Sequence, residues 1–213
     1  MSSQHTCTTY CSRRQFLHTG LILGTSLLLP NLSYAGGFSQ HLQGETWVNG
    51  RIAHHKTKIN ANSLIKTTSH SASFVIGDNA FTLRPHSHVK FTPISSINRG
   101  VISSLRLLTG GLLSVFGKGS KQLLSPAATI GIRGTGVYME STAESSYVCL
   151  CYGQVDVTAN VNAAPTHVLE ATHHHAKRVH TTGTVSDEAM LNHTDDELIY
   201  LESLVGRQVP FKL

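Results

Sequence analysis

Charged residues are scarce in this sequence of 213 residues, since lysine, arginine, aspartate and glutamate make up only 14% of it. Because 40% of the residues are apolar, a chain that is too polar to form a core is excluded. No uninterrupted run of about 18 apolar residues occurs, so no internal transmembrane helix is predicted. Cysteine is limited to four residues, of which Cys149 and Cys151 lie beyond the first 35 positions. The length favours one domain with a sizeable core.

The first 35 residues have the pattern of a targeting segment, which we expect to lie outside the fold. They contain no acidic residue, and a mostly apolar stretch over 16–29 follows two arginines. Small residues precede a predicted cleavage between Ala35 and Gly36, as in secretory signal peptides. Two alternatives remain open, namely that 16–29 is a buried core helix or that the segment stays uncleaved as an anchor.

The paired arginines Arg13 and Arg14 stand in a stretch, 12–17, that resembles the twin-arginine export signal. The resemblance implies that the protein folds in the cytoplasm, crosses the inner membrane folded and resides in the periplasm. Because folding before export often accompanies a cofactor, it also raises the prospect of a bound metal.

Charge is distributed unevenly along the rest of the chain. Residues 46–133 contain eleven lysines and arginines against the single acid Asp78, whereas residues 134–202 contain ten acids against Lys177 and Arg178. Either the two halves pack together and neutralise each other, or the basic half forms a surface for an anionic partner. An anionic lipid, a glycan or an acidic protein face fits such a surface, while nucleic acid is not expected, given one tryptophan and no interleaving of arginine with aromatic residues.

Short apolar segments bounded by glycine, proline, serine or asparagine predict an all-β fold of short antiparallel strands, arranged as a sandwich, roll or solenoid. A hairpin is predicted around 77–79, and 117–121 is interpreted as another hairpin turn. The predicted strands are 71–76, 80–83, 89–91, 102–108, 112–116, 129–132, 137–140, 147–152 and 154–157.

One α-helix is predicted at the C-terminus, over about 195–205. Thr194 and Glu197 have the spacing of a capping box, in which each side chain satisfies a backbone N–H group of the first turn. Leu198, Leu201 and Val205 fall on one helical face, so we expect the helix to dock on the sheet.

Several motifs together resemble the periplasmic FecR domain, with coverage from about 42 to 158. They are the segment 44–51, the hairpin 72–83 followed by Arg84-Pro85, the Ser-Pro-Ala…Arg-Gly-Thr segment 125–135, and the Gly-Gln-Val-Asp-Val strand 153–157. The chain departs from the family pattern at its hairpin turn, Gly-Asp-Asn, and at Ser125 in place of threonine. The resemblance implies three parts: a signal peptide 1–35, a FecR-like β-domain 36–158 and a C-terminal extension 159–213.

Regulatory members of that family combine a cytoplasmic anti-sigma segment, a membrane span and this β-domain. With a leader ahead of the domain, we expect no anti-sigma segment and therefore no sigma-factor partner. What the resemblance implies is a β-rich, partner-binding architecture in the cell envelope.

Cys149 and Cys151 are expected on one face of a strand, because strand side chains alternate. Their expected Cα separation of about 6.6 Å makes an unstrained disulfide improbable, whereas a metal ion spans the gap. Histidines downstream, His173, His174 and His193, with His175 as a substitute, could complete a site for zinc, iron, copper or an iron–sulfur cluster. Short exported FecR-like proteins are similar here, with Cys-x-Cys-Tyr-Gly, a His-His pair and Asn-His-Thr-Asp. The alternative is that the thiols are inert core residues and the histidines are solvated.

No sequence signature of a serine hydrolase, metalloprotease helix, phosphate-binding loop or dinucleotide-binding turn occurs. The sequence therefore predicts a non-enzymatic, exported FecR-like protein that binds an envelope protein or an anionic envelope component. The second hypothesis is a metal- or iron–sulfur-binding protein.

Overall fold

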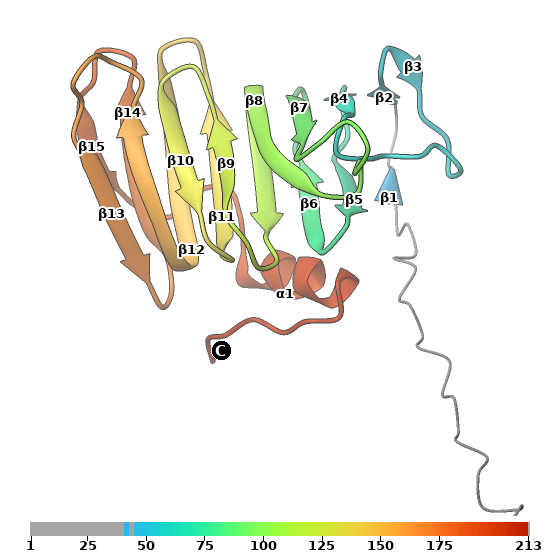
Figure 1. The fold of residues 1–213 in the computed structure, drawn as a ribbon. Helices are drawn as coiled ribbons and strands as arrows, with labels where there is room; N and C mark the ends of the chain where they lie inside the picture. Colours follow the sequence, from blue (N-terminus) through green and yellow to red (C-terminus); the bar gives the residue numbers. More distant parts are fainter. Residues whose placement is uncertain (1–40, 43–44, 213) are drawn as a thin grey trace, which may run out of the picture. The chain divides into compact units, whose positions relative to one another are not determined.

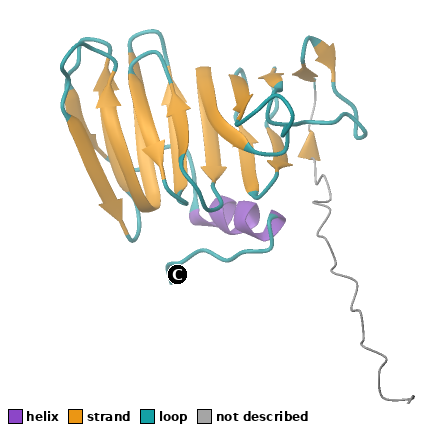
Figure 2. Cartoon of the chain, viewed as in Figure 1, coloured by secondary structure: helices purple, strands orange, loops and turns teal. Residues whose placement is uncertain are grey.

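The computed structural model describes residues 41–42 and 45–212, so the predictions for Arg13, Arg14, Ala35 and Gly36 lie outside the described residues. Within this part of the chain there are fifteen strands and one helix (Figure 1; Figure 2). The all-β prediction with a single C-terminal helix is confirmed. The elements are β1 (His41–Leu42), β2 (Thr46–Val48), β3 (Arg51–Ile52), β4 (Leu64–Thr67), β5 (Ala72–Ile76), β6 (Asn79–Leu83), β7 (His88–Pro93), β8 (Ile102–Val115), β9 (Lys121–Leu124), β10 (Ala128–Ile132), β11 (Gly136–Ser141), β12 (Ser145–Ala159), β13 (Thr166–Ala171), β14 (His175–His180), β15 (Val185–Glu188) and α1 (Asp195–Leu204).

The strands form two sheets that share β8 and β12. The first sheet has the order β1-β5-β6-β8-β11-β12-β14-β15, and the second has the order β3-β2-β4-β7-β8-β9-β10-β12-β13. Alternate side chains of both sheets, among them Phe74, Phe81 and Phe91, pack together in the main core. The segment predicted as an extension, 159–213, contributes β13 to the second sheet and β14 and β15 to the first.

Glycines allow β8 and β12 to pass from one sheet to the other. Gly110 has φ of +85°, and a Cβ atom there would lie 2.1 Å from Ser87 Oγ. Gly153 has φ of +96°, and its Cβ would lie 2.7 Å from Thr135 Cγ2. Only glycine fits this combination of left-handed backbone and close approach. The prediction of two separate strands on either side of each glycine is therefore wrong, since the glycines bend the strands without ending them.

The interpretation of 117–121 as a hairpin turn is also wrong. This segment leads from the end of β8 to β9, and β9 runs parallel to the first half of β8. The buried Lys121 holds the connection, because its ammonium group donates hydrogen bonds to the carbonyl oxygens of Gly117 and Lys118, at 3.1 and 2.9 Å.

Helix α1 packs on the outer face of the first sheet, against side chains of β8, β11 and β12. In Figure 1 it lies below the strands. Its capping box is present, with the Thr194 hydroxyl accepting from the N–H of Glu197 and the Glu197 carboxylate accepting from the N–H of Thr194. Leu198 and Leu201 are buried against the sheet. The prediction of this helix, its cap and its docking is confirmed. Among the described residues, no helix has the length and apolar character that a membrane crossing would need.

Candidate metal centre

Two cysteines and two histidines meet on the outer face of the first sheet, beneath the segment that leads into α1. One ligand atom from each of Cys149, Cys151, His174 and His193 lies within 4.8 Å of all the others. Three of these separations are 3.6 Å for Cys149 Sγ to His174 Nδ1, 3.5 Å for Cys151 Sγ to His193 Nε2, and 3.3 Å for His193 Nε2 to His174 Nδ1.

Local structure explains why these side chains converge. Cys149 and Cys151 lie on β12 and point out of the main core, together with Tyr147, as strand alternation predicted. His174 belongs to the β13–β14 turn, where its φ of +47° and a hydrogen bond from its N–H to the Cys151 carbonyl oxygen at 3.0 Å direct it back over β12. His193 immediately precedes the helix cap, and its ring stacks on Tyr138 with centroids 4.7 Å apart.

Each histidine has a hydrogen-bond acceptor for the ring nitrogen that faces away from the cysteines. His174 Nε2 lies 2.8 Å from Asp195 Oδ1, and His193 Nδ1 lies 2.6 Å from the carbonyl oxygen of Leu191. Both acceptors favour the tautomer in which the outer nitrogen carries the hydrogen. The lone pairs of His174 Nδ1 and His193 Nε2 then face the two sulfur atoms, an arrangement typical of metal-bound histidines.

Burial and charge also suit metal binding. Both cysteines are free and fully buried, His193 is buried, and the His174 side chain is 10% exposed. The hydrogen bond from Cys151 lowers the pKa of Cys149, although burial opposes this effect. Burial raises the pKa of Cys151, and its hydrogen bond to Cys149 raises it further. The lowered pKa of Cys149 favours its thiolate, the form that binds metals.

The geometry matches a tetrahedral ion. With Zn–S of about 2.3 Å and Zn–N of about 2.0 Å, tetrahedral angles place S and N about 3.5 Å apart and two N atoms about 3.3 Å apart. The observed separations of 3.6, 3.5 and 3.3 Å agree with these values. A cluster of two irons would divide the ligands between two centres, whereas here all four ligand atoms lie within 4.8 Å of one another, as the ligands of a single ion do.

The other two predicted histidines lie outside this group of four. His173 Nε2 is 3.0 Å from Asp195 Oδ2, its side chain is 48% exposed, and with His174 and Asp195 it forms a second, more exposed group of possible ligands. His175 begins β14 and faces Asp187 at 3.6 Å. Sequence reasoning included Asp195 in the Asn-His-Thr-Asp motif and in the acidic first turn of the helix, but it did not predict that Asp195 contacts and orients His174.

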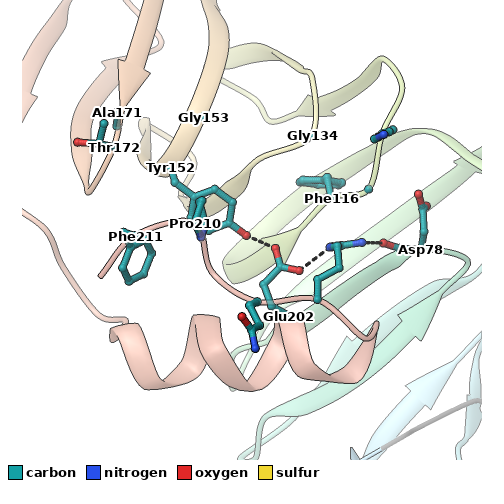
Figure 3. A pocket seen from close by; sticks show the side chains of 14 residues that line it. Asp78, Phe116, Gly134, Tyr152, Gly153, Ala171, Thr172, Glu202, Pro210 and Phe211 are labelled. Carbon is teal, nitrogen blue, oxygen red and sulfur yellow. Dashed lines mark hydrogen bonds and ion pairs between the residues drawn. The ribbon is translucent and has the colours of Figure 1, made fainter. Parts of the chain in front are cut away.

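A cavity of about 670 Å³ adjoins the site (Figure 3). Its floor is a chain of polar contacts in which the Tyr152 hydroxyl donates to Glu202, and Arg207 Nε donates to Glu202 at 2.6 Å. Arg207 Nη1 also donates to the Asp78 carbonyl oxygen at 2.7 Å. Phe211 forms one wall and contacts the His173 ring, with centroids 4.7 Å apart. The C-terminal segment therefore lines the cavity and also contacts His173, beside the metal centre.

Among the described residues, two ion pairs join the basic half of the chain to the acidic half. Of the eleven lysines and arginines in 46–133, only Arg84 and Arg133 form salt bridges. Arg84 binds Glu197 through both guanidinium Nη atoms, at 2.5 and 2.7 Å. The other nine form no salt bridge within the described residues; of these, Lys121 is buried and Lys90 is half-buried, and the remaining seven are exposed, which favours an exposed cationic surface in the basic half.

No model of a known protein family matches the sequence, and no curated protein matches it. Among solved structures, two crystal structures of a candidate anti-sigma factor from Parabacteroides distasonis ATCC 8503 are similar, each at 13% identity. One covers 65% of this chain and 64% of its own with a TM-score of 0.50, and the other covers 59% and 58% with a TM-score of 0.48. The chain thus matches about three-fifths of the length of these structures, and the likeness concerns the fold alone.

Proposed function

We propose that this chain is an exported, non-enzymatic protein of the cell envelope, and that its β-domain holds one divalent transition metal ion, foremost zinc, through Cys149, Cys151, His174 and His193. The observation that carries the proposal is the agreement of the ligand separations with a single tetrahedral ion. Four protein ligands close the coordination sphere, as in structural zinc sites, and leave no position for a substrate.

The ion would join three parts of the chain that are distant in sequence. They are β12, the turn between β13 and β14, and the segment that enters α1. Binding would fix α1 and the C-terminal segment on the outer face of the first sheet. Metal occupancy would then be coupled to the stability of this face, which suits a structural or a sensing role.

The envelope location rests on the leader and on the FecR-like motifs. The twin-arginine resemblance fits a protein that acquires its metal while folding in the cytoplasm, and the FecR resemblance fits a β-domain that binds an envelope component. The unpaired cations of 46–133 support an anionic envelope partner. We propose no sigma-factor contact.

Metal analysis of natively exported protein without an affinity tag tests the proposal. We expect one metal ion per chain, no acid-labile sulfide, and the absorption of tetrahedral thiolate-bound cobalt after exchange with Co²⁺. His174→Ala and His193→Ala should each lose the ion, because each removes one of four ligands.

Matched controls separate a site effect from a general loss of histidine. His175→Ala and His180→Ala change the same residue type on neighbouring β14 and should retain one ion per chain. Circular dichroism of each variant at low temperature verifies that the sheet is intact. Equal metal content in all four variants, or none in folded wild-type protein, would contradict the proposal, and acid-labile sulfide would favour an iron–sulfur cluster instead.

A further inference from the structure

The loop between β7 and β8 presents large apolar side chains to solvent. Ile97 is 95% exposed and Ile94 is 64% exposed, and Val101 at the end of the loop is exposed as well. Isolated exposed apolar residues are ordinary on protein surfaces, but three within eight residues of one loop favour contact with another apolar surface.

Hydrogen bonds give this loop a defined shape. The N–H of Ile94 donates to the Val101 carbonyl oxygen at 3.0 Å and closes its base. Within it, the N–H of Asn98 donates to Ser95 Oγ at 3.1 Å, and the N–H of Gly100 donates to Asn98 Oδ1 at 3.3 Å. Ile97 therefore lies at the tip of a structured turn.

A second, cationic segment packs beside the loop. The N–H of Ala61 donates to the Arg99 carbonyl oxygen at 2.8 Å, and Ile59 and Arg99 both line a hollow of about 360 Å³. Lys56 and Lys58 lie just before this contact. Both lysines and Arg99 are exposed and form no salt bridge in the described structure. The only acid of 46–133, Asp78, lies outside both segments.

We infer that the two segments 53–62 and 94–101, here called the docking loops, bind the surface of an anionic phospholipid bilayer. Ile97 and Ile94 would enter the boundary between headgroups and acyl chains, while Lys56, Lys58 and Arg99 would contact phosphate groups. Apolar tips flanked by cations are the features that give reversible binding to such surfaces. An acidic protein face would satisfy the cations but would leave the protruding isoleucines without an apolar partner.

This inference rests on the part of the proposed function that assigns an anionic envelope partner, and it does not depend on the metal centre. Vesicle co-sedimentation of natively exported protein tests the inference. One set of vesicles contains equal parts of phosphatidylglycerol and phosphatidylcholine, and the other contains phosphatidylcholine alone. We expect binding to the anionic vesicles only, weakening as sodium chloride is raised.

Variants locate the surface. Ile97→Ser should weaken binding about tenfold, because the apolar tip is lost. Val168→Ser removes another well-exposed apolar side chain, on β13, and should leave binding unchanged. The double variant Lys58→Glu/Arg99→Glu should weaken binding about 25-fold or more, since each cation near the surface contributes about fivefold. Lys66→Glu/Arg106→Glu makes the same change in net charge on other strands and should have a much smaller effect.

Absence of binding to the anionic vesicles, equal binding to both vesicle types, or equal losses from the docking-loop variants and their controls would overturn the inference. If vesicles fail to bind while one metal ion per chain is retained, the inference fails and the metal-binding proposal stands. If the charge reversals also leave capture of an acidic envelope polymer unchanged, the assignment of an anionic partner fails with it.

Discussion

The acidic and basic halves of the chain use their charges in opposite ways. Six of the ten acids in 134–202 form salt bridges, including those with histidine, whereas two of the eleven cations in 46–133 do so. In the acidic half, ion pairs fasten β15, the metal centre and α1 to the first sheet. In the basic half, the strands are held by apolar packing, and most of the cations are exposed and form no salt bridge among the described residues. Charge thus contributes to structure mainly in the acidic half.

The largest expected effect tests whether the two halves share one framework through their bent strands. Gly110→Ala in β8 and Gly153→Ala in β12 should each lower the free energy of unfolding by about 3 kcal/mol, because a Cβ atom there is strained by the positive φ and meets a neighbouring residue. Chemical denaturation measures the loss. Gly153→Ala should also lower metal content, since Gly153 follows Cys151 by two positions.

Gly50→Ala is the matched control for these variants. Gly50 has φ of +77°, but a Cβ there would have no neighbour within 4 Å. It should lose only about 1 kcal/mol, from backbone strain alone. Equal losses at Gly50 and Gly110 would show that close packing at the bend contributes nothing.

An intermediate effect distinguishes acids that organise the metal centre from acids that do not. Asp195→Asn should weaken metal affinity about 10- to 100-fold, because the carboxylate accepts from His174 and orients it. Competition with a chromophoric chelator measures the affinity. Asp196→Asn removes the same charge from the same helical turn, but Asp196 is exposed, and the carboxylate that pairs with His173 and His174 is that of Asp195. Similar affinities for the two variants would mean that helix charge, and not the contact with His174, is what matters.

The smallest effect compares a paired with an unpaired cation. Arg84→Ala should lower the free energy of unfolding by about 1 kcal/mol, a modest value because the pair with Glu197 is partly exposed. Arg106→Ala, which removes an exposed cation without a salt bridge, should stay within about 0.5 kcal/mol of wild type. Equal losses of unfolding free energy in the two variants would show that the salt bridge of Arg84 adds no stability.

The stabilisation by the Arg84–Glu197 ion pair depends on pH. Burial raises the pKa of Glu197, but the Arg84 guanidinium outweighs it, so the pKa lies below its ordinary value of 4.5 in the folded protein. The stabilisation is therefore complete above that ordinary value and is lost as the pH falls through the lowered pKa. The difference between wild type and Arg84→Ala should shrink over this acidic range, and it should stay constant near neutral pH.

Local sequence motifs correctly predicted the elements that depend on residues close together in the chain. The capping box at Thr194 and Glu197 located α1, and the trio 77–79 located the β5–β6 hairpin. The pairing of strands that are distant in the chain could not be predicted from the sequence. Gly110 and Gly153 look like strand ends in the sequence, and only the second sheet shows why the strands continue through them.

The sequence predicted that cysteine and histidine form the candidate site, but not which of the histidines belong to it. Strand alternation placed Cys149 and Cys151 on one face, and the structure agrees. The selection of His174 over His173 and His175 depends on a left-handed residue in the β13–β14 turn, which the sequence does not reveal. Metal binding itself stays a prediction.

The two strands that belong to both sheets, β8 and β12, also affect how the domain unfolds. The two sheets cannot separate from each other without breaking the backbone hydrogen bonds of β8 and β12, so we expect the core around these strands to open as one unit. The amide hydrogens in the middle of these strands should be the slowest to exchange with deuterium, and they should do so together. A protease that acts only on opened chains would then meet a single all-or-none barrier.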